Sequence, residues 1–375
     1  MAKIQKQTTE EIINAVMTAD EESLIEEPQK PKASSKVAKR IGIALFVLLN
    51  AVVIFFIAKD ALANEPPPME PFSFANILFL LGGIMCLVVV LGCETTKYLL
   101  MMKHLGEKVS VRHAFSTAAL GKYYDCITPS GAGGQPFQIW YLHSQGYSVG
   151  ASSAMPLSGF FTMQFGFSGL CLIMFTFFNG AMKDPAIKIT AYIGAVAYMV
   201  VPIMIIISGF APKIAMRIVA FFVRIGAFLH IVKNPNHAIM KSVKTLNSYS
   251  RDIKKITANK RLLVKLLLLS LLFQTAMCSM PFFAIHTFGG TIDYFTALAL
   301  CTFIQAAISL IPTPGNSGAA EGAFYIIFST FWPTMLWRFL CYYSFIIIGV
   351  LIYAYTAFVK FKERKKAKQI EDQSK

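Results

Sequence analysis

Two segments rich in proline and glycine interrupt long apolar stretches of the chain. The first, Gly121 to Pro136, contains two prolines and four glycines, and the second runs from Ile311 to Phe324. Proline removes an amide donor and glycine weakens a helix, so a continuous helix is not expected in either segment. The apolar runs beside the first segment are each too short to cross a bilayer, which predicts a re-entrant hairpin with its tip inside the protein.

Freed backbone amides at such breaks suit anions, and phosphate needs no special side-chain chemistry there. Hydroxyl and amide side chains in both segments add further donors and acceptors. Glycines that only pack helices together are the alternative, but the prolines argue against it as a full account. The candidate substrate-binding residues are Lys122, Asp125, Thr128, Pro129, Ser130, Gly131, Gly133, Gly134, Gln135 and Pro136, then Thr313, Pro314, Gly315, Asn316, Ser317, Gly318, Glu321 and Arg338.

Charged residues in apolar surroundings are also functional candidates, because each costs about 3 kcal/mol to insert. Lys122 precedes Asp125 by three residues and is its expected partner on one helical face. Arg338 is the most plausible counter-ion for Glu321, since few other intramembrane cations exist. Glu94 and Lys265 lie near span ends, where we expect both to reach the interface.

The two broken segments correspond to each other when they are aligned on their Thr-Pro pairs, at Thr128 and Thr313. Gly133 then matches Gly318, and both interiors are rich in small residues. Paired interrupted segments are the best sequence pointer to a midplane site in transporters built from repeats. Two matching short motifs leave internal duplication a hypothesis.

The elements that carry these segments are apolar helices. Of the 375 residues, 55% are hydrophobic and 15% charged, which excludes a water-soluble domain. Alternating segments of about 10 residues, typical of an outer-membrane barrel, do not occur. The sequence predicts an all-α polytopic membrane protein with about six full spans and two broken-helix segments. The expected spans are Ile41 to Ala58, Phe74 to Cys93, Val149 to Phe178, Ile187 to Phe210, Leu262 to Phe288 and Met335 to Phe358.

The net charge of +15 is concentrated in loops that flank the spans. The segments Lys97 to Arg112, Lys213 to Arg261 and Lys360 to Lys368 are basic, whereas Asp60 to Pro71 is acidic and rich in proline. The positive-inside rule explains this pattern better than nucleic-acid binding does. It predicts an inner-membrane protein with cytoplasmic N- and C-termini.

The expected organisation is a polar tail (1–40), a transmembrane domain (41–358) with a basic cytoplasmic segment (211–261), and a basic cytoplasmic tail (359–375). The first span precedes a sequence that resembles a signal-peptidase site, but the leader is too long, which favours an uncleaved helix. Lys213, Arg217 and Arg224 share one helical face, which predicts an amphipathic helix in the headgroup region. A cytoplasmic extension of the preceding span is the alternative.

Histidine and cysteine show no metal-ligand spacing. The seven cysteines have no CxxC pair, and the six histidines are scattered without an HExxH motif. Neither a metal nor another cofactor is expected, and the cysteines are interpreted as small buried hydrophobic residues.

The broken segments resemble a known family. Tyr123-Tyr124, the run from Thr128 to Pro136 with Gln138 to Leu142 after it, and the run from Pro312 to Gly322 are similar to the signatures of the flippase-like transmembrane region of lysylphosphatidylglycerol synthases. The resemblance covers residues 40 to 358. Longer members carry an aminoacyl transferase domain after this region, and the sequence here reaches Lys375 without one, so a stand-alone transmembrane region is expected.

The resemblance implies movement of a phospholipid, or of an aminoacyl- or glycolipid, between leaflets. Gln135 and Gln138 stand where many relatives have an acidic residue and an arginine, so neither the headgroup nor a role in resistance to cationic peptides carries over. The expected partners are membrane phospholipids, anionic or modified, and a separate lipid-modifying enzyme is a candidate.

Two other functions stay open. One is a lipid-modifying enzyme or subunit of the phosphatidylglycerol lysyltransferase type, although the sequence lacks a recognisable nucleophile, base and orienting group. The other is a secondary transporter of a small solute. No GxxxxGK[ST] motif is present, so ATP is not expected to drive transport directly.

Overall fold

The computed structural model describes residues 73–358, apart from 129–130, 183–184, 211, 229–234, 237, 241–257, 310, 312, 314, 329 and 357. The predicted first span and both tails therefore lie outside the described residues. Three candidate site residues, Pro129, Ser130 and Pro314, lie outside them as well.

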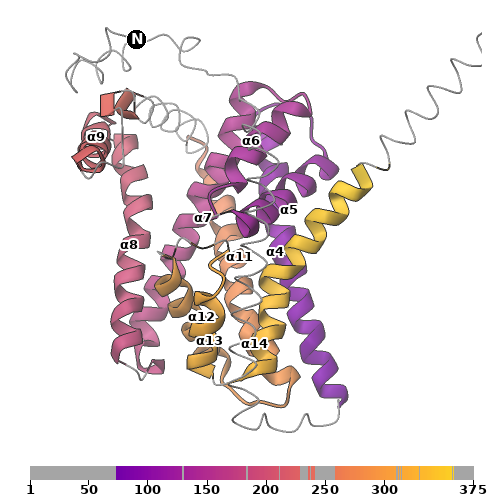
Figure 1. The fold of residues 1–375 in the computed structure, drawn as a ribbon. Helices are drawn as coiled ribbons and strands as arrows, with labels where there is room; N and C mark the ends of the chain where they lie inside the picture. Colours follow the sequence, from indigo (N-terminus) through magenta and orange to yellow (C-terminus); the bar gives the residue numbers. More distant parts are fainter. Residues whose placement is uncertain are drawn as a thin grey trace, which may run out of the picture.

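The described part of the chain is helical and contains no strand (Figure 1). A π-helical turn, η3 (Phe339–Tyr343), follows α14, and helix then continues to Thr356. The elements are α4 (Phe74–His104), α5 (Val111–Ile127), α6 (Gly134–Ser144), α7 (Val149–Phe177), the short η2 (Asn179–Ala181), α8 (Pro185–Phe210), α9 (Pro212–Phe228), α11 (Lys260–Thr287), α12 (Tyr294–Ile308), α13 (Ala319–Phe328) and α14 (Phe331–Arg338).

Four described helices are long and apolar enough to cross a membrane: Phe74–His104, Val149–Phe177, Lys260–Thr287 and Phe331–Thr356. Helix α8 adds 26 residues, or about 39 Å at 1.5 Å per residue. Large apolar side chains such as Leu81, Leu268 and Val350 are more than half exposed, as lipid-facing side chains are. The predicted class, an all-α multi-pass membrane protein, is confirmed.

Helix α11 lies at the centre of the bundle and packs against α4, α7, α12 and α14 (Figure 1). Its buried face includes Leu266, Phe273, Ala276 and Met280. Where α7 crosses it, Gly166 faces the backbone of Ser270, and an added Cβ would lie 2.8 Å from the Ser270 carbonyl carbon. A small residue is therefore needed for this close crossing.

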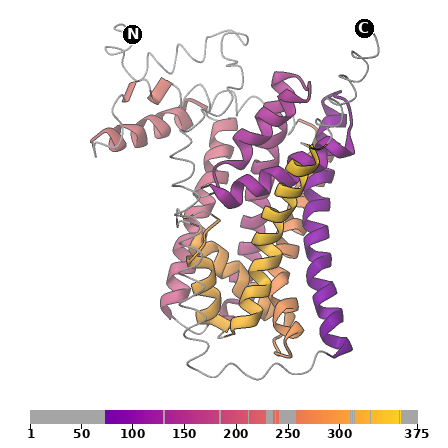
Figure 2. The same ribbon diagram turned by 45° about the vertical axis from the view of Figure 1, so that its right-hand side comes forward.

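Both broken segments form helical hairpins, α5–α6 and α12–α13. The first lies toward the end of the bundle where α11 begins, at Lys260, and the second toward the end where α11 finishes, at Thr287 (Figures 1 and 2). The predicted helix break is present in both segments. The first break is shorter than expected, because α5 continues past Gly121 to Ile127 and α6 starts at Gly134, with Pro136 in its first turn, where a missing amide costs no hydrogen bond.

Helix α9 is separate from α8 and lies beside one end of the bundle, roughly crosswise to the long helices (Figure 2). Met216 and Ala220 are buried, while Ile214 and Phe221 are 51% and 61% exposed. An exposed apolar face on a helix that also carries exposed Lys213 suits the boundary between headgroups and acyl chains. The arrangement favours the amphipathic-helix interpretation over an extension of the preceding span.

The crossing of α8 and α12 provides a direct test of the packing. An alanine Cβ at Gly194 would lie 2.6 Å from the Ala306 carbonyl carbon and 3.0 Å from the Ala307 Cα, and backbone cannot move aside cheaply. We expect Gly194→Ala to lower the free energy of unfolding by about 1–3 kcal/mol. Gly92→Ala is the matched control, because nothing lies within 4 Å of its added Cβ. It should gain up to about 1 kcal/mol from helix propensity. Unfolding of detergent-solubilised protein measures both, and equal effects would contradict the packing.

Candidate functional site

A cavity of about 380 Å³ lies inside the bundle, where the two helix breaks meet. Gly131 and Gln135 from the first break line it together with Gly315 and Asn316 from the second. Helices α4, α7, α8 and α11 supply further lining residues, as do α5, α12, α13, α14 and η3. Segments separated by almost 200 residues along the chain thus share one polar space.

The first break is closed by side chains at and just after the end of α5, which accept hydrogen bonds from amides at the start of α6. The Gly134 N–H donates to Asp125 Oδ1 at 3.1 Å, and the Gly133 N–H donates to Thr128 Oγ1 at 2.9 Å. Gly131 has φ 62°, in the left-handed region that favours glycine. Both amides are therefore occupied by the chain's own side chains in this structure, and phosphate binding at the first break stays a prediction.

The second break is closed in the same way by Glu321. Its Oε2 accepts the N–H of Gly318, the residue that precedes α13, at 2.7 Å, as an acidic residue at the third helical position does in a capping box. Gly315, Asn316 and Gly318 all have positive φ, at 54°, 55° and 89°. At the start of both α6 and α13, a carboxylate of the chain therefore accepts a backbone N–H. The Gly318 amide is thus also occupied in this structure.

The predicted ion pair between Glu321 and Arg338 is present. Arg338 Nε donates to Glu321 Oε1 at 2.7 Å, and the two side chains are only 2% and 5% exposed. Arg338 also donates to the Gly315 carbonyl and to Ser317 Oγ, both at 3.3 Å, so that it holds the turn of the second break. Both residues thus stabilise the second helix break, and Arg338 also lines the cavity.

Arg338 is also connected to the first break, through Tyr342. The guanidinium carbon lies 4.2 Å from the centroid of the Tyr342 ring, a cation–π contact, and the Tyr342 hydroxyl donates to the Cys126 carbonyl at 3.1 Å. Both residues adjoin or belong to the π-helical turn, an irregularity common at functional sites. A continuous set of contacts thus links the two breaks.

Lys122 and Asp125 form the second predicted pair, with 3.7 Å between Lys122 Nζ and Asp125 Oδ2. Their side chains are 24% and 28% exposed, and both line the cavity. Lys122 Nζ also lies 4.9 Å from the centroid of the Phe273 ring. This ion pair is longer and more exposed than the pair between Glu321 and Arg338.

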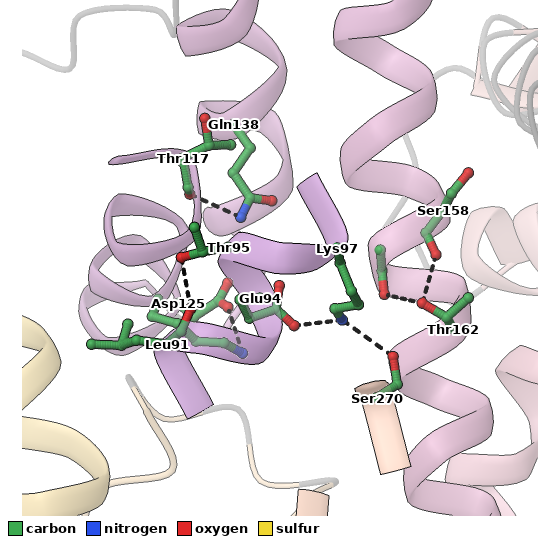
Figure 3. Close-up of polar contacts among 12 residues, drawn as sticks. Leu91, Glu94, Thr95, Lys97, Thr117, Asp125, Gln138, Ser158, Thr162 and Ser270 are labelled. Carbon is green, nitrogen blue, oxygen red and sulfur yellow. Dashed lines mark hydrogen bonds and ion pairs between the residues drawn. The ribbon is translucent and has the colours of Figure 1, made fainter. Parts of the chain in front are cut away.

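A third pair was not predicted. Glu94 is buried, not turned toward the interface as the sequence suggested, and its Oε1 lies 2.5 Å from Nζ of Lys97 (Figure 3). Lys97 is fully buried and donates to Ser270 Oγ at 3.2 Å. Helix α4 continues to His104, past the predicted end at Cys93, which brings Lys97 inside the bundle and out of the loop to which its charge was assigned.

Glutamine side chains on apolar helices are the other residues that sequence reasoning missed. Gln164, Gln274 and Gln305 line the cavity from α7, α11 and α12. Gln138 lines it as well, and its Nε2 donates to the Thr117 carbonyl at 3.2 Å (Figure 3). An isolated glutamine in a long apolar run was the signal that could have identified them.

The candidate site residues divide into three groups. Those that line the cavity are Lys122, Asp125, Gly131, Gln135, Gly315, Asn316 and Arg338. Those that build the helix breaks behind it include Thr128, Gly133, Gly134, Pro136, Thr313, Ser317, Gly318 and Glu321. Pro129, Ser130 and Pro314 lie outside the described residues.

The bundle, with a cavity lined in part by polar side chains, defines a multi-pass helical membrane protein. The family model for the lysylphosphatidylglycerol synthase TM region matches residues 40–359, and the chain belongs to this family. It is similar to an Archaeoglobus fulgidus protein named "UPF0104 membrane protein", with 23% identity over 352 residues, covering 84% of this chain and 96% of that relative. No solved structure matches the chain.

Proposed function

We propose that the protein binds the headgroup of a phospholipid, or of an aminoacyl- or glycolipid, in the cavity and moves it between leaflets. The observation that carries the proposal is the meeting of two broken-helix hairpins at one polar cavity inside an apolar bundle. Membership of the lysylphosphatidylglycerol synthase TM region family supports a lipid substrate.

The polar side chains that line the cavity can replace the hydrogen bonds and the charge stabilisation that a headgroup loses when it leaves water. A charged group pays a large desolvation penalty in hydrocarbon about 30 Å thick. Lys122 and Arg338 can attract a phosphate, and Gln135 and Asn316 can donate or accept hydrogen bonds. The lipid's acyl chains would stay among the exposed apolar side chains on the outside of the bundle.

The hairpins approach the cavity from opposite ends of the bundle (Figures 1 and 2). In transporters, discontinuous helices at the midplane allow the site to be exposed to one side and then to the other. This arrangement supports translocation rather than static binding. The Arg338–Tyr342–Cys126 contacts would transmit movement from one hairpin to the other.

The orientation in an inner membrane belongs to the same proposal. Lys103 lies at the end of α4, Lys108 in the loop that follows and Arg112 at the start of α5. The Asn259 amide before α11 contacts His104 at 3.4 Å, so Lys260 and Arg261 lie at the same end of the bundle. By the positive-inside rule this end would face the cytoplasm, and both termini would lie there too.

Reconstituted vesicles with fluorescent lipids separate the candidate functions. We expect wild-type protein to make the inner-leaflet pool of fluorescent phosphatidylglycerol accessible to an external quencher, faster than in protein-free vesicles. Uptake of soluble glycerol phosphate or lysine without lipid exchange would instead favour a small-solute transporter. A change in lipid mass with lysyl-tRNA present would favour a transferase. A lack of exchange for anionic, zwitterionic and aminoacylated lipids alike would contradict the proposal.

A further inference from the structure

Glu94 stands between the cavity and a fully buried lysine. Its side chain lines the cavity, whereas Lys97 lies behind it, 0% exposed, and does not line the cavity. Both are on α4, and Ser270, which accepts from Lys97, lies about 15 Å along α11 from Lys260. Binding a headgroup, as proposed above, does not require this buried pair (Figure 3).

The charges around the cavity cancel. Among the described residues, Glu94, Lys122, Asp125 and Arg338 line it, and Lys97 and Glu321 are the ion-pair partners behind them. Three carboxylates and three cations give a net charge of zero. A phosphodiester headgroup brings one negative charge, and an uncompensated charge is costly in a low-dielectric site. Binding of one proton at a carboxylate would restore neutrality.

Glu94 is the carboxylate best placed to take that proton. Asp125 and Glu321 each accept a backbone N–H at the start of a helix, from Gly134 and Gly318, so protonating either would weaken a helix break. Glu94 lies within the continuous helix α4, and no backbone hydrogen bond of the described residues depends on it. Lys122 and Asp125 of α5, Arg338 of α14, Gln164 of α7 and Gln274 of α11 share the cavity with it.

We propose that Glu94 is the proton-binding site of an electroneutral symport of one proton with one anionic lipid headgroup. This inference rests on the proposed lipid translocation. The proton forms an O–H bond on the Glu94 carboxylate, which becomes a neutral acid. Lys97 keeps its ammonium group, held by Ser270 Oγ and by the Phe273 ring, whose centroid is 5.9 Å from Nζ. The released positive charge balances the headgroup phosphate.

Linkage makes the effect reciprocal: an anionic headgroup raises proton affinity, and a proton raises headgroup affinity. Because the loaded cavity carries no net charge, membrane potential should not drive transport, whereas a pH gradient should. The anionic headgroup should accumulate in the leaflet that faces the alkaline side, by up to about tenfold per pH unit for one proton per lipid.

Proteoliposomes with fluorescent phosphatidylglycerol and clamped potential test the coupling. Wild-type protein should enrich the probe in the leaflet on the alkaline side, and a zwitterionic phosphatidylcholine probe should show no such enrichment. Glu94→Gln should lose the enrichment, and because it also removes the ion-pair partner of the buried Lys97, its unfolding is measured on the same preparation. Glu107→Gln, in the loop after α4 and outside the cavity, should behave as wild type.

The outcomes separate the two proposals. Lipid exchange by the wild-type protein without enrichment would overturn proton coupling and leave translocation intact. Enrichment that survives in Glu94→Gln would overturn the assignment of the proton to Glu94. Infrared spectra of the detergent-solubilised protein give a readout independent of transport. Adding phosphatidylglycerol at neutral pH should produce a carboxylic-acid band that is missing in Glu94→Gln. Absence of that band in wild type would contradict the proposal even if no lipid exchange is seen.

Discussion

Replacing Glu321 by glutamine is expected to lower the free energy of unfolding by about 3 to 5 kcal/mol, because it strands a buried arginine. Arg338 is 4% exposed, and its other described donor contacts, to the Gly315 carbonyl and Ser317 Oγ, are both neutral and 3.3 Å long. Arg338→Gln should cost a similar amount, since it leaves the Glu321 carboxylate without its cation. Titration of the folded protein in mixed micelles with a denaturing detergent measures each change.

The double change should recover part of the loss. With both charges removed, neither residue is stranded, so Glu321→Gln with Arg338→Gln should be less destabilising than the sum of the single changes. Lys122→Gln with Asp125→Asn is the matched control cycle, because that pair is about a quarter exposed and 3.7 Å apart. We expect a coupling of at most about 1 kcal/mol there. Additive losses at Glu321 and Arg338 would show that the two residues are not coupled.

Glu321→Gln, Arg338→Gln and the variant with both changes should also lose lipid exchange. Arg338 holds the turn at Gly315 and contacts Tyr342, which reaches the first break, so the cavity loses its shape when either charge is removed. The double variant should therefore regain stability without regaining exchange. Recovery of both together would mean that the pair matters only for folding.

The Glu321–Arg338 pair was predictable because the sequence offers few cations inside apolar runs. Glu94 and Lys97 were misassigned for a physical reason. The apolar pattern of the span ends near Cys93, and charge counting then places Lys97 in a loop, although α4 continues to His104 with both residues facing the bundle. An acid and a base three residues apart, on a helix longer than the hydrocarbon requires, was the missed signal.

Proline and glycine in the sequence predicted the two helix breaks, but not which backbone amides at those breaks are hydrogen-bonded. Whether an amide at a helix start is free depends on side chains that fold back onto it, here Asp125, Thr128 and Glu321. That closure requires positive φ at Gly131 and Gly315 and is decided by tertiary packing. The meeting of the two hairpins at one cavity likewise depends on long-range contacts that no local pattern encodes.

A leucine at Gly159 is expected to block the cavity without unfolding the protein. Gly159 lines the cavity from α7, and no heavy atom lies within 4 Å of an added Cβ, so the larger side chain has room to extend into the cavity. Crowding a filled site costs about 1–3 kcal/mol, which would weaken headgroup binding by about 5- to 150-fold. Leucine also favours helix over glycine, so stability should be unchanged or slightly higher.

Gly169 provides the matched control. It lies on the same helix, also has no heavy atom within 4 Å of an added Cβ, and does not line the cavity. Gly169→Leu should keep both stability and lipid exchange. The comparison therefore separates filling of the cavity from the general effect of a leucine on α7.

The most direct test of the account is the rate of phosphatidylglycerol exchange between leaflets in vesicles that contain Gly159→Leu or Gly169→Leu, with unfolding measured on the same preparations. We predict that Gly159→Leu slows lipid exchange at least about fivefold with its stability retained, while Gly169→Leu exchanges lipid as wild type does. Wild-type exchange in a folded Gly159→Leu variant would show that headgroups do not pass through this cavity, and would contradict the proposed function at its centre.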